Sequence, residues 1–258
     1  MSKRTDVWLT LVFCLLLACN CMPAALAKGQ AQTVGVLKLE QTHCTIDKIE
    51  VLLSNQAVKI KIKKSDTFLI ARAPTWKVVW YRNDPKTAFE ISFSEWCTTG
   101  TKLVPIGTFR PRPFKQEGVT KISGESIVKL SSNERKKLLD FWLVDDRTRP
   151  QPASDILISL FRLPPAKGVP YKFKVTYLQP DVENKTQISW IKGGSLFEKE
   201  EGTRLYTTKM SRVTVPSSEF DYPQNYKLVK QEQQVWLTSG TREAVDDLLN
   251  MPTLEYKK

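Results

Sequence analysis

The chain has one histidine, His43, and it stands next to Cys44. A cysteine and a histidine can form the nucleophile and base of a covalent enzyme, but their side chains must lie within hydrogen-bond reach of each other. Neighbouring residues on a strand point to opposite faces, and residues 34–41, just before this pair, alternate as a strand does. We therefore interpret His43 as an ordinary histidine at a strand end, and we expect no catalytic residues and no enzymatic activity.

The sequence also lacks recognisable patterns for metal or phosphate binding. The acidic pairs Asp145-Asp146, Glu200-Glu201 and Asp246-Asp247 do not have the alternating spacing of a calcium loop. Gly193-Gly194 lacks the flanking residues of a phosphate-binding loop, and there is no G-x-S-x-G nucleophile motif. We expect neither a metal nor a cofactor.

Aromatic and branched side chains are dense between residues 76 and 96. Alternation on strands places them on shared faces. One interpretation is a dry core packed under helices, and the other is an apolar cavity that accepts an acyl chain. The candidate cavity residues form two sets, Trp76, Val78 and Trp80 in the first, and Phe89, Ile91 and Phe93 in the second.

Three lysines, Lys59, Lys61 and Lys63, alternate with apolar residues, so one face of this strand is buried and the other is cationic. The cationic face could meet anionic head groups, or it could be a solvated face whose lysines protect the sheet from edge aggregation. The formal net charge of the chain is +12. Such a charge favours anionic partners, such as a membrane or envelope surface; we consider nucleic acid unfavoured as a partner.

The first residues have the order of a secretory signal peptide. Lys3 and Arg4 precede an apolar run over residues 7–18, and Ala25-Leu26-Ala27 forms a small-x-small cleavage site before the polar residues that follow. We predict a signal peptide over residues 1–27 and export to the periplasm or the outside of the cell. An alternative is a lipobox at residues 16–19, with Cys19 as a lipid-anchored first residue.

Removal of residues 1–27 leaves two of the five cysteines, Cys44 and Cys97. Two cysteines in an exported chain suggest one disulfide, because the compartment is oxidising. Two unpaired, partly buried thiols are the alternative.

The elements that must position these residues are mostly strands, separated by short turn segments. Short links between successive strands indicate an antiparallel meander. We expect a loop over 103–121, a helix that begins near Ser131 and continues through Trp142, a short helix or buried strand over 154–161, and a last helix over 242–250. The expected strands are 34–41, 48–53, 57–64, 67–73, 77–82, 87–96, 171–178, 186–191, 204–215 and 226–236.

Two segments make the chain resemble the LolA-like superfamily of outer-membrane lipoprotein-sorting proteins. Residues 68–78 (FLIARAPTWKV) are similar to that group's strand, proline-containing turn and strand, and residues 217–229 (SSEFDYPQNYKLV) are similar to its segment before a last strand. The resemblance implies a large curved antiparallel sheet, a half-barrel, with a few helices packed on its concave face, in a single domain over residues 28–258. It also implies acyl-chain binding, with Arg72 as a possible counterpart of the family's acyl-binding arginine.

These observations predict a mainly β, α+β, protein that works as a non-enzymatic binding or carrier protein, with an apolar cavity for lipid or lipoprotein acyl chains. The alternative is a structural or interaction protein of the cell envelope that docks on anionic surfaces. Its contact residues would be the basic side chains Lys59, Lys61, Lys63 and Arg72.

Overall fold

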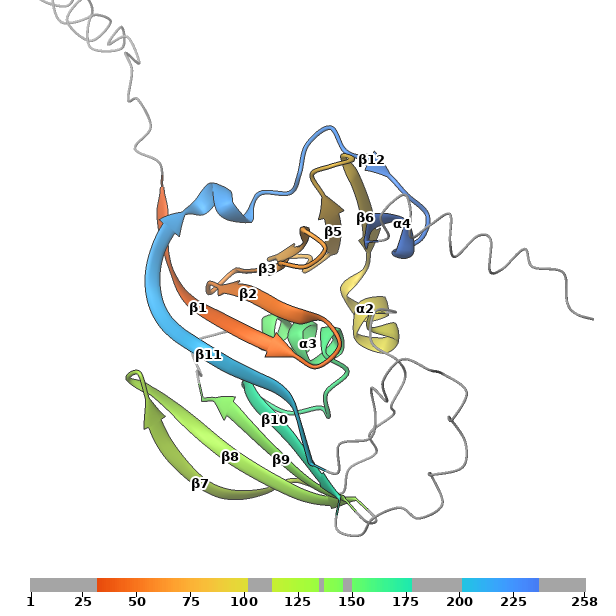
Figure 1. Cartoon of the computed structure of the whole chain (residues 1–258). Helices are drawn as coiled ribbons and strands as arrows, with labels where there is room; N and C mark the ends of the chain where they lie inside the picture. Colours follow the sequence, from red (N-terminus) through yellow and green to blue (C-terminus); the bar gives the residue numbers. More distant parts are fainter. Residues whose placement is uncertain (1–31, 102–112, 135–136, 146–149, 178–200, 237–258) are drawn as a thin grey trace, which may run out of the picture. The chain divides into compact units, whose positions relative to one another are not determined.

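The computed structural model describes residues 32–101, 113–134, 137–145, 150–177 and 201–236 (Figure 1). The chain divides into two compact units, Met1–Thr33 and Val34–Lys258. The predicted signal peptide, the predicted strand over 186–191 and the predicted helix over 242–250 lie outside the described residues. In the part of the chain that the structure describes, the helices are too short or too polar to span a membrane.

The described part of Val34–Lys258 is built on one open sheet of twelve strands. Its order is β12-β6-β5-β4-β3-β2-β1-β11-β10-β9-β8-β7, so β12 and β7 are the edges. Neighbouring strands are antiparallel wherever their register is defined, except that β12 is parallel to β6. The strands are β1 (Thr33–His43), β2 (Asp47–Leu53), β3 (Ala57–Ile62), β4 (Thr67–Arg72), β5 (Val78–Arg82), β6 (Thr87–Ile91), β7 (Lys115–Ile122), β8 (Glu125–Glu134), β9 (Lys137–Val144), β10 (Val169–Tyr177), β11 (Glu201–Pro216) and β12 (Lys227–Leu228).

Alternating side chains explain why the first strands form a meander with one buried face. In β2 and β3, Val51 pairs with Ile60 on the core face, and Glu50 pairs with Lys61 on the other. Val51 and Ile60 are fully buried. Burial of one face specifies the register, because a slip of one residue would move every apolar side chain into water.

Helices α2 (Phe93–Thr99) and α3 (Gln151–Leu160) lie beside each other in the structure (Figure 1). Ile156 and Leu157 of α3 are buried in the same cluster as Trp80 of β5 and Phe173 of β10. Because α3 shares one core with strands from both halves of the sheet, the sheet curves around the helices. The predicted fold, a mainly β half-barrel with helices on its concave face, is confirmed.

The helix predicted from Ser131 to Trp142 is wrong, because residues 131–134 and 137–142 belong to the paired strands β8 and β9. The capping-box spacing of Ser131 and Glu134 is a local signal, whereas the observed structure depends on partners distant in sequence. Phe141 pairs with Leu130 of β8 and with Phe173 of β10. Tertiary pairing here outweighs the local helix signal.

Other boundaries also differ from the prediction. The strand expected over 87–96 ends at Ile91, where Ser92 caps α2 by accepting a hydrogen bond from the Glu95 backbone N–H. The end of the expected loop over 103–121 forms most of β7. The strand expected over 226–236 is reduced to β12, followed by a short helix, α4 (Gln233–Trp236). The segment 154–161, for which the sequence leaves a short helix and a buried strand both open, forms a helix, α3, which begins at Gln151 and ends at Leu160.

Candidate ligand-binding cleft

The predicted apolar cavity around Trp80 is instead a filled core. Trp80 and Val78 are 0% exposed, and Trp76 is 8% exposed. A side chain that lines a space large enough for water keeps some accessible surface, so no such space adjoins Trp80. Its ring centroid lies 5.9 Å from that of Trp96 on α2. The second predicted set, Phe89, Ile91 and Phe93, is partly buried against the same core cluster.

The predicted basic strip has carboxylate partners. Ion pairs join Lys59 to Glu219 at 2.6 Å, Lys61 to Asp66 at 3.1 Å, and Arg72 to Asp221 at 2.8 Å. Lys63 is exposed. The pairs add little to stability because most of these groups are solvated, but they offset the positive charge that a docking surface would offer.

The partners Glu219 and Asp221 come from a segment that begins with the 3-10 helix η3 (Ser217–Phe220). Phe220 is buried in a second, smaller cluster with Val79 and Tyr81, on the face of β5 opposite Trp80. This segment therefore covers part of the outer face of the sheet, and its acidic side chains reach Lys59 and Arg72 there.

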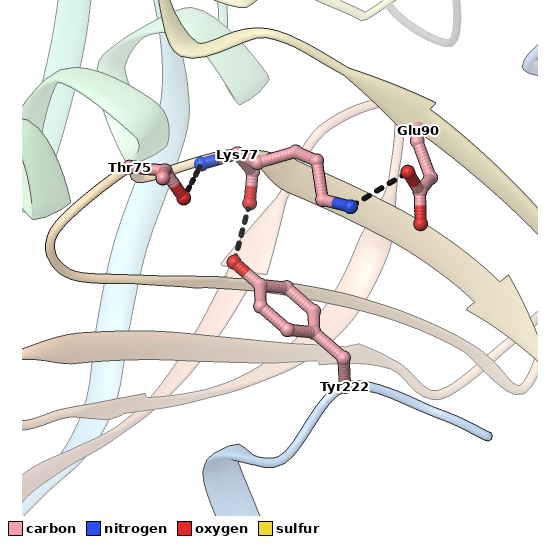
Figure 2. Close-up of polar contacts among 4 residues, drawn as sticks. All are labelled: Thr75, Lys77, Glu90 and Tyr222. Carbon is pink, nitrogen blue, oxygen red and sulfur yellow. Dashed lines mark hydrogen bonds and ion pairs between the residues drawn. The ribbon is translucent and has the colours of Figure 1, made fainter.

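Figure 2 shows how this segment is attached. The Tyr222 hydroxyl donates to the Lys77 carbonyl at 3.0 Å, and the Lys77 ammonium pairs with Glu90 at 2.6 Å. The Lys77 backbone N–H donates to the Thr75 hydroxyl at 3.4 Å. The two segments on which the LolA-like resemblance rests, 68–78 and 217–229, are thus in direct contact.

His43 is buried at 2% exposure and stacks on Phe161 with ring centroids 5.4 Å apart. Its Nδ1 accepts hydrogen bonds from the Thr45 and Ile46 backbone N–H groups at 3.2 and 3.3 Å. Burial, together with the nearby Arg204 guanidinium, lowers the pKa of His43 to about 4, although a hydrogen bond to the Phe161 backbone opposes this. His43 is therefore neutral near pH 7.

The predicted disulfide between Cys44 and Cys97 is not formed, and both thiols are free and exposed. Cys44 follows the buried His43 and lies 3.7 Å from the Thr45 hydroxyl. Cys97 lies on α2 rather than at a strand end, and it is hydrogen-bonded to Ser159 of α3. Although Cys97 as a whole residue is exposed, partial burial of its thiol beside α3 is the main reason that the pKa of this thiol is raised. The change from strand to helix after Ile91 alters the direction in which residue 97 projects, which explains the wrong pairing.

A cleft with a volume of about 510 Å³ lies on the half of the sheet that runs from β11 to β7, away from Trp80 on β5. Four strands supply its walls, namely β7, β9, β10 and β11. This volume falls within the range of small-molecule sites, about 300 to 1,000 Å³. Three aromatic rings, three threonines, one isoleucine and one lysine line it: Thr120, Ile122, Trp142, Tyr171, Lys172, Thr203, Tyr206 and Thr207.

The apolar floor of the cleft adjoins the main core. Ile122, Trp142 and Tyr171 are partly buried and pack against the main core cluster. Trp142 stands between the buried Phe141 and Leu143, so it projects from the opposite face of β9. Tyr206 of β11 is 42% exposed, which makes it one of the most exposed large apolar residues in the described ranges.

Two lysine ammonium groups lie close to the Trp142 ring. The Lys172 ammonium lies 4.9 Å and the Lys129 ammonium 5.6 Å from the ring centroid. Register explains this geometry, because Trp142 pairs with Lys129 on β8 and with Lys172 on β10. Lys129 is also 3.4 Å from the Asp140 carboxylate.

A buried polar network holds the back of the cleft. Gln41, 2% exposed, donates from Nε2 to the Pro170 carbonyl at 2.7 Å and to the Thr207 hydroxyl at 3.0 Å. The Thr207 hydroxyl in turn donates to the Tyr171 carbonyl at 2.7 Å. These bonds tie β1, β10 and β11 together where two of the lining residues stand.

An ion pair supports the wall formed by β7. Arg212 of β11 donates to both oxygens of Glu125 on β8, from Nε at 2.6 Å and from Nη2 at 2.9 Å. Glu125 pairs in register with Ile122, a lining residue of β7. The bidentate bond therefore connects the turn between β7 and β8 with β11 across the cleft.

Sequence reasoning missed every residue of this cleft. It predicts a helix at Trp142, and it treats Lys172 and Tyr206 as parts of ordinary strands. The alternation of Phe141, Trp142 and Leu143 is an available signal, because it indicates an aromatic ring on the face opposite the core. No sequence signal shows which distant residues surround that ring.

No family model matches the chain, and no curated protein matches it. Among solved structures, it is similar to an uncharacterized conserved protein from Thermus thermophilus, with a TM-score of 0.37 and 10% identity over 79% of this chain and 93% of that one. It is also similar to PNGF-II, in structures in the C2 and P21 space groups, with a TM-score of 0.40 in both. The identities are 9% and 10% over 80% of this chain, which spans 32% and 34% of the PNGF-II chains. Similarity at this level assigns neither a family nor a function.

Proposed function

We propose that the protein is a non-enzymatic binding or carrier protein that holds the apolar chain of a lipid in the cleft between β7 and β11. The supporting observation is the floor of Ile122, Trp142 and Tyr171, which adjoins the main core yet borders a space of about 510 Å³. Apolar and aromatic walls with a few polar groups are typical of ligand sites. In this proposal the ligand lies in the cleft and not on the face around Trp80, which is filled by protein side chains.

The open form of the cleft suits reversible binding. A chain in an open cleft keeps part of its apolar surface in water, which limits the gain of about 25 cal/mol per Å² of buried apolar surface. Losses of translational and conformational freedom cost at least about 4 kcal/mol. We therefore expect weak binding, which suits a carrier that must release its ligand.

The alternative, docking on an anionic surface through the basic strip, has weaker support. Lys59, Lys61 and Arg72 each pair with a carboxylate of the protein itself. An anionic surface would have to compete with those carboxylates.

Titration with a fluorescent long-chain fatty acid tests the proposal. We expect saturable binding by the wild-type protein. We expect about fivefold weaker binding by Tyr206→Ala, because this substitution removes the apolar contact that about half of the tyrosine side chain would make with the ligand. Leu228→Ala is the matched control, because Leu228 is also exposed but lies on β12, at the opposite edge of the sheet. Absence of fatty-acid and phospholipid binding by the wild type would refute a lipid-binding function, and binding of an acidic oligosaccharide instead would identify a sugar site.

We further propose that the protein is exported, to the periplasm or beyond, after cleavage of residues 1–27. The support is the basic start, the apolar run and the Ala25-Leu26-Ala27 site. The intact mass of the exported protein is expected to equal that of residues 28–258. A mass that corresponds to an acylated chain beginning at Cys19 would contradict this cleavage and indicate a membrane-anchored lipoprotein.

A further inference from the structure

The strand β10 has an irregularity that brings two consecutive side chains to the cleft. Tyr171 and Lys172 both line it, although neighbours on a regular strand point to opposite faces. The register of β10 against β9 shifts between Pro170 and Lys172, leaving Tyr171 without a directly paired residue on β9. Such a bulge re-aims side chains, and here it places an ammonium group beside an aromatic wall.

Lys172 differs from the other lysine near Trp142. Lys129 has Asp140 within ion-pair distance, whereas in the described ranges no carboxylate forms an ion pair with Lys172. The Lys172 ammonium instead lies 4.9 Å from the Trp142 ring centroid. It is therefore a cation at the cleft that can accept an anionic partner from outside the protein.

We propose that Lys172 selects lipids with an anionic head group, by pairing its ammonium with a carboxylate or phosphate while the chain lies along Trp142, Tyr171 and Tyr206. This inference rests on the proposed function of the cleft and adds the class of its ligand. The indole supports the ammonium electrostatically, and partial exclusion of water beside the rings strengthens its attraction for an anion. The excess of positive charge on the chain draws such ligands to the protein in the first place.

The expected selectivity is measurable with ligands that share one chain length. A charge-assisted hydrogen bond to Lys172 should make a long-chain fatty acid bind about tenfold more tightly than the corresponding fatty alcohol at neutral pH. A lysophospholipid whose head group ends in a phosphate monoester distinguishes the two anions: tighter binding than the fatty acid would identify phosphate as the preferred group. Added salt should weaken binding of the acid more than binding of the alcohol.

Substitutions at two lysines test the assignment. We expect Lys172→Gln to remove the preference for the acid, so that acid and alcohol bind with similar affinity, and Lys172→Arg to retain the preference. Lys63→Gln is the control, because it removes the same charge from an exposed site that does not line the cleft. Circular dichroism confirms that each variant is folded.

The outcomes separate this inference from the function on which it rests. If the wild type binds neither ligand, lipid binding itself is wrong. If it binds acid and alcohol equally, or if Lys172→Gln keeps the preference, the cleft binds chains and Lys172 does not select the head group. Loss of both ligands in a folded Lys172→Gln variant would also overturn the inference, since the lysine would then support the site as a whole.

Discussion

Substitution of Trp80 by aspartate is expected to unfold the sheet domain. Trp80 is 0% exposed and packs against Trp96 of α2. The substitution leaves a large cavity and buries a carboxylate without a partner, and the two effects together cost more than about 4 kcal/mol. Such a loss is a large share of the total stability of an ordinary domain. Urea unfolding followed by circular dichroism, together with the yield of soluble protein, measures the effect.

Two variants sharpen this test. Lys63→Asp changes an exposed residue to the same carboxylate, and we expect it to fold with nearly wild-type stability. Trp80→Phe keeps an aromatic ring and removes an indole N–H that has no hydrogen-bond partner among the described residues, so its cost should be much smaller than that of the aspartate. A Trp80→Asp protein that folds normally but no longer binds fatty acid would show that the ligand site lies under the helices after all.

Acidification is expected to destabilise the protein between pH 6.5 and pH 4 through His43. The ordinary pKa of histidine is 6.5, and in the folded protein that of His43 is about 4. As the pH falls through this window, the unfolded chain gains a proton on His43 that the folded chain does not. The free energy of unfolding therefore decreases with falling pH, by up to about 3 kcal/mol from this residue at about 1.4 kcal/mol per pH unit.

A single histidine makes the measurement direct. The imidazole proton signals in an NMR titration belong to His43 alone, and we expect their midpoint near pH 4. His43→Asn is the matched variant, because its side-chain oxygen can accept the hydrogen bonds from Thr45 and Ile46 without titrating. Its stability should fall less steeply than that of the wild type over the same window. A midpoint near the ordinary value of 6.5 in the folded protein would mean that His43 is accessible to solvent.

Local patterns were sufficient for the strands that form a meander. Between residues 34 and 82, alternation, turn residues and short links predicted β1 to β5 within a few residues, because each strand pairs with the next one along the chain. The same reasoning failed at Ser131 and Glu134, where a local capping signal competed with pairing to β7 and β9. It also missed the end of β6 at Ile91, where a side-chain cap begins α2.

By itself, then, the sequence determined the class of fold, the lysines on the face of β3 opposite the core and the density of aromatic residues, since alternation and composition are properties of short segments. Only the tertiary structure decided that Trp80 is covered by α2, and that Glu219 and Asp221 reach Lys59 and Arg72. It also decided that Trp142, Lys172 and Tyr206 share one cleft. The reason is that sheet order, strand register and the bulge in β10 arise from pairing between strands that are distant in the sequence, and these contacts set the side chains that face a ligand.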